Sequence, residues 1–462
     1  MRLFLRCVVA CFVVNGPSVL MGQVDTSDTS GRMEDVLIIG YGKSTKKEFT
    51  GANSSLKGQS LEKLSIPRMD QALQGQIPGV VVSTNSGSPG GTSSIRIRGL
   101  STFGDNDPLI LVDGVVYDSE GLNALNPNDI ASINVLKDAT AGIYGVRAAN
   151  GVIIVETKKG QLKSAPRWEF SGFQGMQQTA KKLDLLNAKE YAILKNEMFA
   201  AGGEAMPFKN TSLGEGTNWQ DSIFKLAPVY QYNVSVSGGN DKSTYSVGGS
   251  VYDQQGIVGL EKANFKRING RVNFDTRMSD KWRYSSVFLY TNEKRSGLPE
   301  NGIGSVLYNT INAFPTDPIK GSNGKYTYLE EVADIINPFA QMANTYNWAW
   351  VNKFVGKQEL TADLSENLTF TNRFNYNFAL VDNKAFSPLV WFGTGKAQNT
   401  ALNENLDPTM VEIAPGTKIE RGASVSEGKA TYGDLNFESF ITSMIFSNIS
   451  SLEISNTFSK PP

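Results

Sequence analysis

The feature that most constrains this chain is a series of segments after residue 166 in which apolar and polar residues alternate. The clearest are YQYNVSVS at 230–237, INGRVNFD at 268–275 and LTFTNRFNYNF at 368–378. A period of two places apolar side chains on one face of a β-strand and polar side chains on the other. Turn-forming stretches such as GGNDK at 238–242 separate the segments, so we predict a long meander of antiparallel hairpins.

Alternation alone fits both a soluble β-sandwich and a membrane barrel, because each buries one face of its strands. Three features favour the membrane: a secretory signal, the length of the meander, and aromatic residues toward the ends of the runs. These aromatic residues are Tyr230, Trp282, Tyr290 and Tyr376. The runs are about ten residues long, which suits a tilted membrane-spanning strand, and no run of about 18 apolar residues predicts a transmembrane helix.

Residues 1–22 have the layout of a secretory signal peptide. Arg2 and Arg6 precede an apolar run at 7–14, and small residues follow up to Gly22. A buried strand and a lipoprotein cleavage box ending at Cys11 are the less favoured interpretations. We expect residues 23–48 to form a polar, flexible tail around a short apolar segment.

The composition excludes several classes of function. The chain contains no histidine, and both of its cysteines, Cys7 and Cys11, lie in the predicted signal peptide. Most protease relays and imidazole or thiolate metal sites are therefore excluded. Lys and Arg together number 44 and Asp and Glu 45, a net charge of −1, which argues against a nucleic-acid partner. We expect no enzyme activity, no metal site and no cofactor.

Residues 49–160 have a mixed α and β pattern that predicts a compact domain. The residues at helical spacing are Met69, Ala72, Leu73 and Ile77, and Pro78-Gly79 should end that helix. Asn126 before Pro127 predicts a capped helix start. Short apolar runs at 80–82, 109–112 and 152–155 predict buried strands.

One helix should interrupt the later strands. The segment NAKE at 187–190 is similar to a capping box, and it predicts a helix that starts after Asn187. Tyr191, Leu194 and Met198 would form the apolar stripe of this helix. We expect it to lie in a loop between two strands.

Several blocks of the sequence resemble the SusC/RagA family of TonB-dependent outer-membrane transporters. The blocks are LIIGYGK at 37–43, SIRIRG at 94–99, PLILVDGV at 108–115, NPNDIASINVLKDATAGIYG at 126–145 and ANGVIIV at 149–155. They occur in the family's order over more than a hundred residues. The helix start LNAKEY at 186–191 also resembles the family, whereas beyond residue 230 only the alternating texture is similar.

This resemblance implies a membrane β fold. An α/β plug domain at 49–160 would be followed, at 161–462, by an incomplete antiparallel transmembrane β-barrel, about half of a 22-stranded one. The implied partners are TonB as energy transducer, a SusD-like surface lipoprotein, outer-membrane lipid, and an oligosaccharide or peptide cargo. By position, the TonB-box candidate consists of Glu34, Asp35, Val36, Leu37, Ile38 and Ile39. An extended apolar segment suits strand addition to a partner sheet, but it is also typical of a first plug strand.

The family blocks also mark residues expected to have structural roles in the plug. These are Arg96, Arg98, Gly99, Asp113, Gly114, Lys137, Asp138, Tyr144, Gly145 and Gly151. We expect Arg96 and Arg98 to share one face of a strand, with Asp113 and Glu156 as partners. A gating role is the less favoured alternative. The glycines should serve backbone turns.

The strand count predicts that this barrel does not close around its plug. We count about ten strand candidates after residue 160, and ten tilted strands give a backbone diameter of about 20 Å. A plug of this size is about 35 Å across. The last residues, SKPP at 459–462, also lack the aromatic end of the family's closing strand. We therefore expect a truncated or fragmentary member that forms no working pore by itself.

We predict a component of TonB-dependent nutrient import in the outer membrane of a Gram-negative-type bacterium. An exported adhesin or ligand-binding module without a pore is the first alternative, and it would fold in water without detergent. A secreted carbohydrate-active enzyme is the second, and it would hydrolyse its substrate when purified. The sequence does not identify the cargo.

Overall fold

The computed structural model describes residues 36–39, 42–45, 53–62, 68–84, 86–104, 106–117, 120–137, 144–332, 334–388, 390, 392, 410–414, 417–420 and 423–443. The predicted signal peptide lies outside these residues, as do Glu34, Asp35 and Asp138. The chain divides into two units at residue 50. In the first unit, Val36–Ile39 (β1) pairs antiparallel with Gly42–Thr45 (β2).

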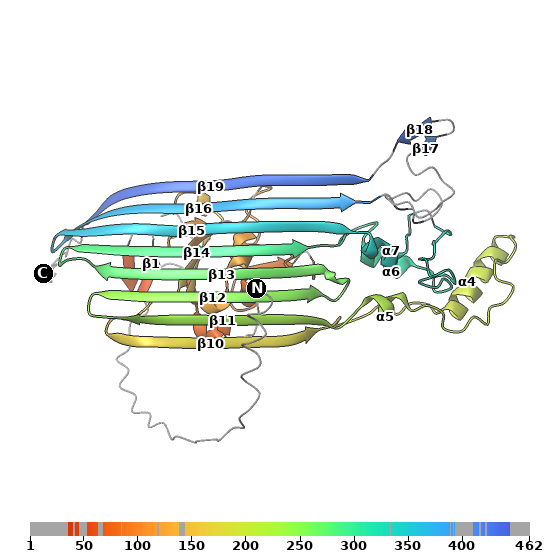
Figure 1. The fold of residues 1–462 in the computed structure, drawn as a ribbon, viewed down its shortest axis with the longest axis horizontal. Coiled ribbons are helices and arrows are strands. Elements are labelled where there is room, and N and C mark those ends of the chain that lie inside the picture. The colour runs from red at the N-terminus through yellow and green to blue at the C-terminus, as the bar shows by residue number, and fades with distance from the viewer. Residues whose placement is uncertain are drawn as a thin grey trace, which may run out of the picture. The chain divides into compact units, whose positions relative to one another are not determined.

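The second unit contains an eight-stranded antiparallel sheet (Figure 1). Its strands, in sheet order, are Ser164–Gln177 (β10), Ala227–Gly239 (β11), Ser243–Gly256 (β12), Leu260–Arg277 (β13), Trp282–Ser296 (β14), Tyr346–Ser365 (β15), Leu368–Ser387 (β16) and Ser424–Ser443 (β19). Spatial order follows chain order throughout, as expected for the predicted meander. Met410–Ala414 (β17) and Thr417–Glu420 (β18) form a separate hairpin.

The strands differ from the prediction in length, and not all of them join the sheet. They contain 13 to 20 residues, whereas the sequence predicted runs of about ten. The hydrogen-bonded ladder continues through segments in which the alternation is lost, such as 382–387 of β16. Of the ten strands described after residue 163, eight belong to the sheet. Within the described residues, β10 and β19 each pair on one side only, so this sheet is open.

The two ends of the sheet differ. At one end, called here the turn end, short connections at 240–242, 278–281 and 366–367 join neighbouring strands. At the other, the loop end, three of the four connections, at 178–226, 297–345 and 388–423, are long, and the fourth, at 257–259, is short. In Figure 1 the tight turns lie at the left, and the helices of the long connections lie beyond the right-hand ends of the strands.

The plug precedes the sheet and has a five-stranded mixed sheet in the order β3-β8-β9-β6-β7. Its strands are Asn53–Lys57 (β3), Leu109–Val112 (β6), Val115–Tyr117 (β7), Ile130–Leu136 (β8) and Val152–Thr157 (β9). Val80–Thr84 (β4) and Ser93–Ile97 (β5) form a second small sheet. The structure confirms the strands predicted at 80–82, 109–112 and 152–155. Alternate side chains of these strands (Val80, Val82, Ile110, Val112, Ile153 and Val155), with those of Met69 and Leu73, belong to a buried apolar core.

Five short helices complete the described part of the plug. They are Gly58–Glu62 (α2), Met69–Leu73 (α3), Glu120–Ala124 (η1), Pro127–Asp129 (η2) and Val146–Ala148 (η4). Asn126 caps η2 by accepting a hydrogen bond from the Asn128 amide. The predicted helix is wrong beyond this turn, because β8 begins at Ile130. β-branched residues favour a strand there, and pairing with β3 and β9 completes its ladders.

The loop end carries the helices Ala188–Ala201 (α4), Trp219–Ile223 (α5), Val306–Asn312 (α6) and Pro338–Ala343 (α7). The capping box of α4 is confirmed: Asn187 and Glu190 bond each other's backbone amides. The predicted stripe is wrong, because Leu194 and Met198 are exposed and the buried positions include Ala192 and Asn196. The Asn196 amide bonds both backbone groups of Phe208, which fixes this polar face against its own loop.

Candidate functional site between the plug and the sheet

The sheet has a polar buried face and an apolar exposed face, the reverse of a sheet in a water-soluble protein. The buried polar side chains are Gln231, Ser246, Ser250, Arg267, Asn269, Arg271, Asn273, Thr291, Lys353, Lys357 and Asn375. The exposed apolar ones include Trp168, Phe170, Tyr232, Val251, Ile268, Val272, Phe374, Leu435 and Phe437. Such an arrangement suits a sheet with hydrocarbon on one side and a polar interior on the other.

The plug lies against the polar face and contacts seven neighbouring strands. The sheet residues in these contacts are Glu169 (β10), Gln231 and Asn233 (β11), Gly248 (β12), Arg271 (β13), Val287 and Leu289 (β14), Lys353 (β15) and Asn377 (β16). Val287, Leu289 and Val355 belong to the apolar core of the plug. The core therefore extends across the boundary between the two regions.

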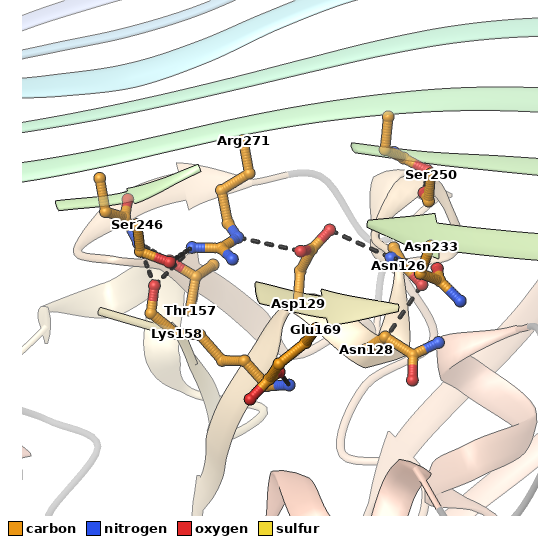
Figure 2. Close-up of polar contacts among 12 residues, drawn as sticks. Asn126, Asn128, Asp129, Thr157, Lys158, Glu169, Asn233, Ser246, Ser250 and Arg271 are labelled. Carbon is orange, nitrogen blue, oxygen red and sulfur yellow. Dashed lines mark hydrogen bonds and ion pairs between the residues drawn. The ribbon is translucent and has the colours of Figure 1, made fainter. Parts of the chain in front are cut away.

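Arg271 forms the central charged contact between the two regions (Figure 2). Its Nε lies 3.0 Å from Oδ1 of Asp129 in the plug, and its side chain is 1% exposed. Its Nη1 donates to the Ser246 hydroxyl at 2.9 Å and to the carbonyl of Lys158. The close approach requires Gly248, because a Cβ there would lie 2.8 Å from Asp129 Oδ1. Breaking a buried ion pair by removing one partner costs about 3–5 kcal/mol.

A second contact joins Asn273 to the end of β9. The Asn273 amide donates to Thr157 Oγ1 at 2.6 Å and to the Lys158 carbonyl at 2.8 Å. Thr157 in turn donates to Asp113 through its amide, at 3.2 Å, and its hydroxyl, at 2.6 Å. Asp113 thus anchors the plug side of a chain of hydrogen bonds that reaches the sheet.

A third contact uses the turn that begins at Asn126. The Asn126 amide donates to Asn233 at 2.9 Å and accepts from Gln231 at 3.0 Å (Figure 2 shows Asn126 beside Asn233). Farther along the sheet, the Lys353 ammonium lies 3.9 Å from the centre of the Tyr117 ring. These contacts are polar and directional, so they fix the position of the plug against the sheet and also strengthen its binding to the sheet.

The structure places the residues of the family blocks as follows. Gly99, Gly114, Gly145 and Gly151 all have positive φ. At Gly151 a Cβ would also lie 2.8 Å from Ile97 Cδ1. Lys137 donates to the Ser54 hydroxyl at 2.6 Å and to the Pro78 carbonyl. Tyr144 is half-buried.

Arg96 lies in β5, but Arg98 lies beyond the end of that strand with a φ of 59°. The prediction that they share a strand face is therefore wrong, since the chain turns at Arg98-Gly99. The carboxylates expected to pair with them have other contacts: Asp113 bonds Thr157, and Glu156 accepts from Ser132 at 2.9 Å.

Sequence reasoning missed the sheet side of this site. Arg271 and Asn273 occupy polar positions of a recognised alternating run, which was a usable signal, but nothing local distinguishes them from other polar positions. Of the TonB-box candidate, Val36–Ile39 forms β1. No described helix is both long and apolar enough to cross a membrane. Within the same residues, no three His, Cys, Asp or Glu side chains converge to hold a metal ion.

Comparison with known proteins supports the class that this geometry indicates. The TonB-dependent Receptor Plug Domain family matches residues 45–152. TonB-dependent receptor P26 of Formosa agariphila is 33% identical over 443 residues, which are 90% of this chain and 44% of that protein. TonB-dependent receptor SusC of Bacteroides thetaiotaomicron is 33% identical over 341 residues, 71% of this chain and 33% of SusC.

Among solved structures, the RagAB peptide importer in its open-open state aligns with a TM-score of 0.70. The identity is 21%, and the alignment covers 88% of this chain and 54% of that one. This likeness concerns the fold. The chain spans less than half the length of the two curated relatives named above.

A plug bonded to the polar face of a membrane-type sheet, with these relatives, defines a TonB-dependent receptor, a class of outer-membrane proteins. Within this class, the match to SusC identifies the chain as a member of the SusC/RagA family. The relatives named above are receptors and transporters rather than enzymes.

Proposed function

We propose that this chain supplies the plug and part of the barrel wall of an importer that carries oligosaccharides or peptides across the outer membrane with energy from TonB. The observation that carries the proposal is the reversed sheet, whose polar face is bonded to the plug and whose apolar face is exposed. A soluble adhesin or enzyme would expose the polar face.

The loop end would face the cell exterior and the turn end the periplasm, because outer-membrane barrels have long external loops and short periplasmic turns. Two of the long connections pack against each other: Trp219, Phe314 and Leu329 form a buried cluster that joins the loops at 178–226 and 297–345. A structured external surface of this kind suits a SusD-like lipoprotein that covers the loop end.

The polar contacts explain why energy would be needed. Separating Arg271 from Asp129 would leave the buried guanidinium without its carboxylate. Loss of one partner of a buried ion pair costs about 3–5 kcal/mol, and each 1.4 kcal/mol is a factor of ten in population. Thermal opening of the plug would therefore be rare. A pull from TonB, applied through the candidate segment 34–39 by strand addition, would supply the work.

Two measurements test this proposal. Uptake of fluorescent oligosaccharides and peptides is compared between cells with the intact gene and cells with an in-frame deletion of codons 34–39. The deletion should abolish uptake while the protein remains in the outer-membrane fraction. Deletion of the polar stretch 25–30 is the matched control and should have little effect. Unchanged uptake after deletion of 34–39, or in cells without TonB, would contradict the proposal.

Binding of the purified chain to the periplasmic domain of TonB gives the second measurement. The intact chain should bind and the 34–39 deletion should not. Co-purification with a SusD-like lipoprotein tests the external partner in the same preparation.

A further inference from the structure

A polar cavity lies on the inner face of the sheet at its loop end. It has a volume of about 370 Å³, and its lining residues include Arg295, Glu300, Asn301, Asn347 and Asn383. Arg295 lies next to the end of β14, Asn347 lies next to the start of β15, and Asn383 lies near the end of β16. The volume falls within the range of about 300–1,000 Å³ that is typical of small-molecule sites.

Two of these lining residues also hold the plug. Arg295 Nη2 lies 3.1 Å from Glu300 Oε1 and donates to the Ser88 hydroxyl at 3.2 Å. The Ser86 hydroxyl donates to Glu300 Oε2 at 2.7 Å. Ser86 and Ser88 belong to the connection between β4 and β5, and the two hydroxyls lie 2.9 Å apart. We call this four-residue arrangement the clasp.

The plug segment at the clasp fits closely against the sheet. Gly90 lies so near the Phe265 ring of β13 that a Cβ would be 2.4 Å from Cδ2. The connection is therefore held from two sides, by the clasp and by this packing. Loss of the clasp would release one side only.

We propose that this cavity binds a neutral, hydroxyl-rich ligand such as a segment of an oligosaccharide, and that binding loosens the clasp. Three asparagine amides line the cavity, and each offers donors and an acceptor, which match hydroxyl groups that also donate and accept. The two charged lining residues neutralise each other, so the lining favours neither an anion nor a cation. This inference rests on the proposed import function and names its cargo class and its link to the plug.

The link follows from competition for the same groups. A hydroxyl that bonds Arg295 or Glu300 replaces a bond to Ser88 or Ser86. Coupling of this kind is reciprocal: if the ligand weakens the clasp, then loss of the clasp strengthens ligand binding. Couplings of this type correspond to factors of about 5–150 in affinity.

The test is calorimetric titration of the full chain in detergent with neutral malto-, xylo-, manno- and fructo-oligosaccharides, oligogalacturonates, and neutral tetrapeptides. At least one neutral oligosaccharide should bind. N347A/N383A should weaken its binding at least tenfold, whereas S86A/S88A should tighten it about fivefold or more. The control N292A/N352A removes two amides that bond each other on the same sheet and should leave affinity unchanged.

Hydrogen exchange gives an independent readout of the clasp. Adding the bound oligosaccharide should speed exchange of the amides at 86–91 in the native chain and have little effect in S86A/S88A. Binding of none of the neutral oligosaccharides, stronger binding of oligogalacturonates or peptides, or unchanged affinity in N347A/N383A would overturn the proposal. These measurements need no TonB. A negative result here would therefore not contradict energy-coupled import, and a negative uptake result would not contradict ligand binding in the cavity.

Discussion

The plug and the sheet bury opposite kinds of side chain. In the plug, Ile110, Ile133 and Ile153 are fully buried, as in a protein that folds in water. In the sheet, Arg267 and Arg271 are buried and Phe170 is 75% exposed. One physical rule accounts for both regions, because each surface is matched to the medium that it meets. The plug meets a mostly polar wall, interrupted by the apolar side chains of Val287, Leu289 and Val355, whereas the outer face of the sheet meets hydrocarbon.

The comparison also separates two sources of stability. The plug has its own apolar core, whereas the sheet relies on its ladders, on lipid, and on polar contacts with the plug. Mutations should therefore act differently according to the region and the face of the strand. The following predictions are arranged from the largest expected effect to the smallest.

Replacement of Arg271 by Leu should have the largest effect. It leaves Asp129, whose side chain is 13% exposed, without its partner and should lower the free energy of unfolding by about 3–5 kcal/mol. Urea denaturation in detergent, with protease cleavage of the plug as a second readout, measures the change. The double variant R271L/D129N should recover part of the loss. If D129N alone behaved like R271L and the double variant lost the sum of both, the ion pair would not join the regions.

Ile153→Ala tests the plug as an ordinary core. It should cost about 2–5 kcal/mol, as is usual for large-to-small changes at buried apolar positions. Detergent or lipid should not change this loss. A loss that disappeared in detergent would mean that the plug interior is not a water-type core, and the contrast between the regions would fail.

Val272→Lys tests the outer face of the sheet. The residue neighbours Arg271 in sequence but lies on the opposite, exposed face, where a lysine should cost about 2–4 kcal/mol in a bilayer. Assembly into vesicles measures this cost. The matched change Thr431→Lys, on the outer face of β19, shows whether the penalty extends to the edge strand. A lysine tolerated at Val272 in lipid would contradict the membrane assignment of this face.

The smallest expected effect is a pH dependence of stability that comes from Tyr191 at the loop end. Burial and a hydrogen bond to Glu331, at 3.0 Å, raise the pKa of Tyr191 above its usual value. Because the folded pKa is raised, stability is unaffected below the unfolded pKa of about 10 and falls as the pH rises above it. Absorbance at 295 nm follows tyrosine ionisation, and Glu331→Gln should move the ionisation of Tyr191 to lower pH than in the native chain. An unchanged titration in this variant would exclude Glu331 as a cause.

Much of the fold could be predicted from sequence because its signals are local. A period of two identified the strands near residues 230, 270 and 370, and the capping pattern at Asn187 gave the start of α4. The error at Asn126 was of another kind. Its cap was recognised, but pairing of Ile130–Leu136 with two distant strands ended the helix after one turn.

The site could be predicted only in part, because its contacts join residues far apart in the chain. Asn126 bonds Gln231, and Asp129 bonds Arg271. Arg271 and Arg283 look alike in sequence, yet the first side chain is 1% exposed and the second 50%. The position of each arginine along its strand, and whether the plug lies opposite that position, decide which side chain is buried. Neither can be read from the neighbouring residues in the sequence.

Gly248 has a consequence for how the plug sits in the wall. Because β12 has no side chain at this position, Arg271 and Asp129 can meet directly above its backbone. A methyl group added at position 248 would push Arg271 and Asp129 apart. The close fit of the plug against the sheet therefore depends on the absence of a side chain at Gly248 as much as on the hydrogen bonds around it.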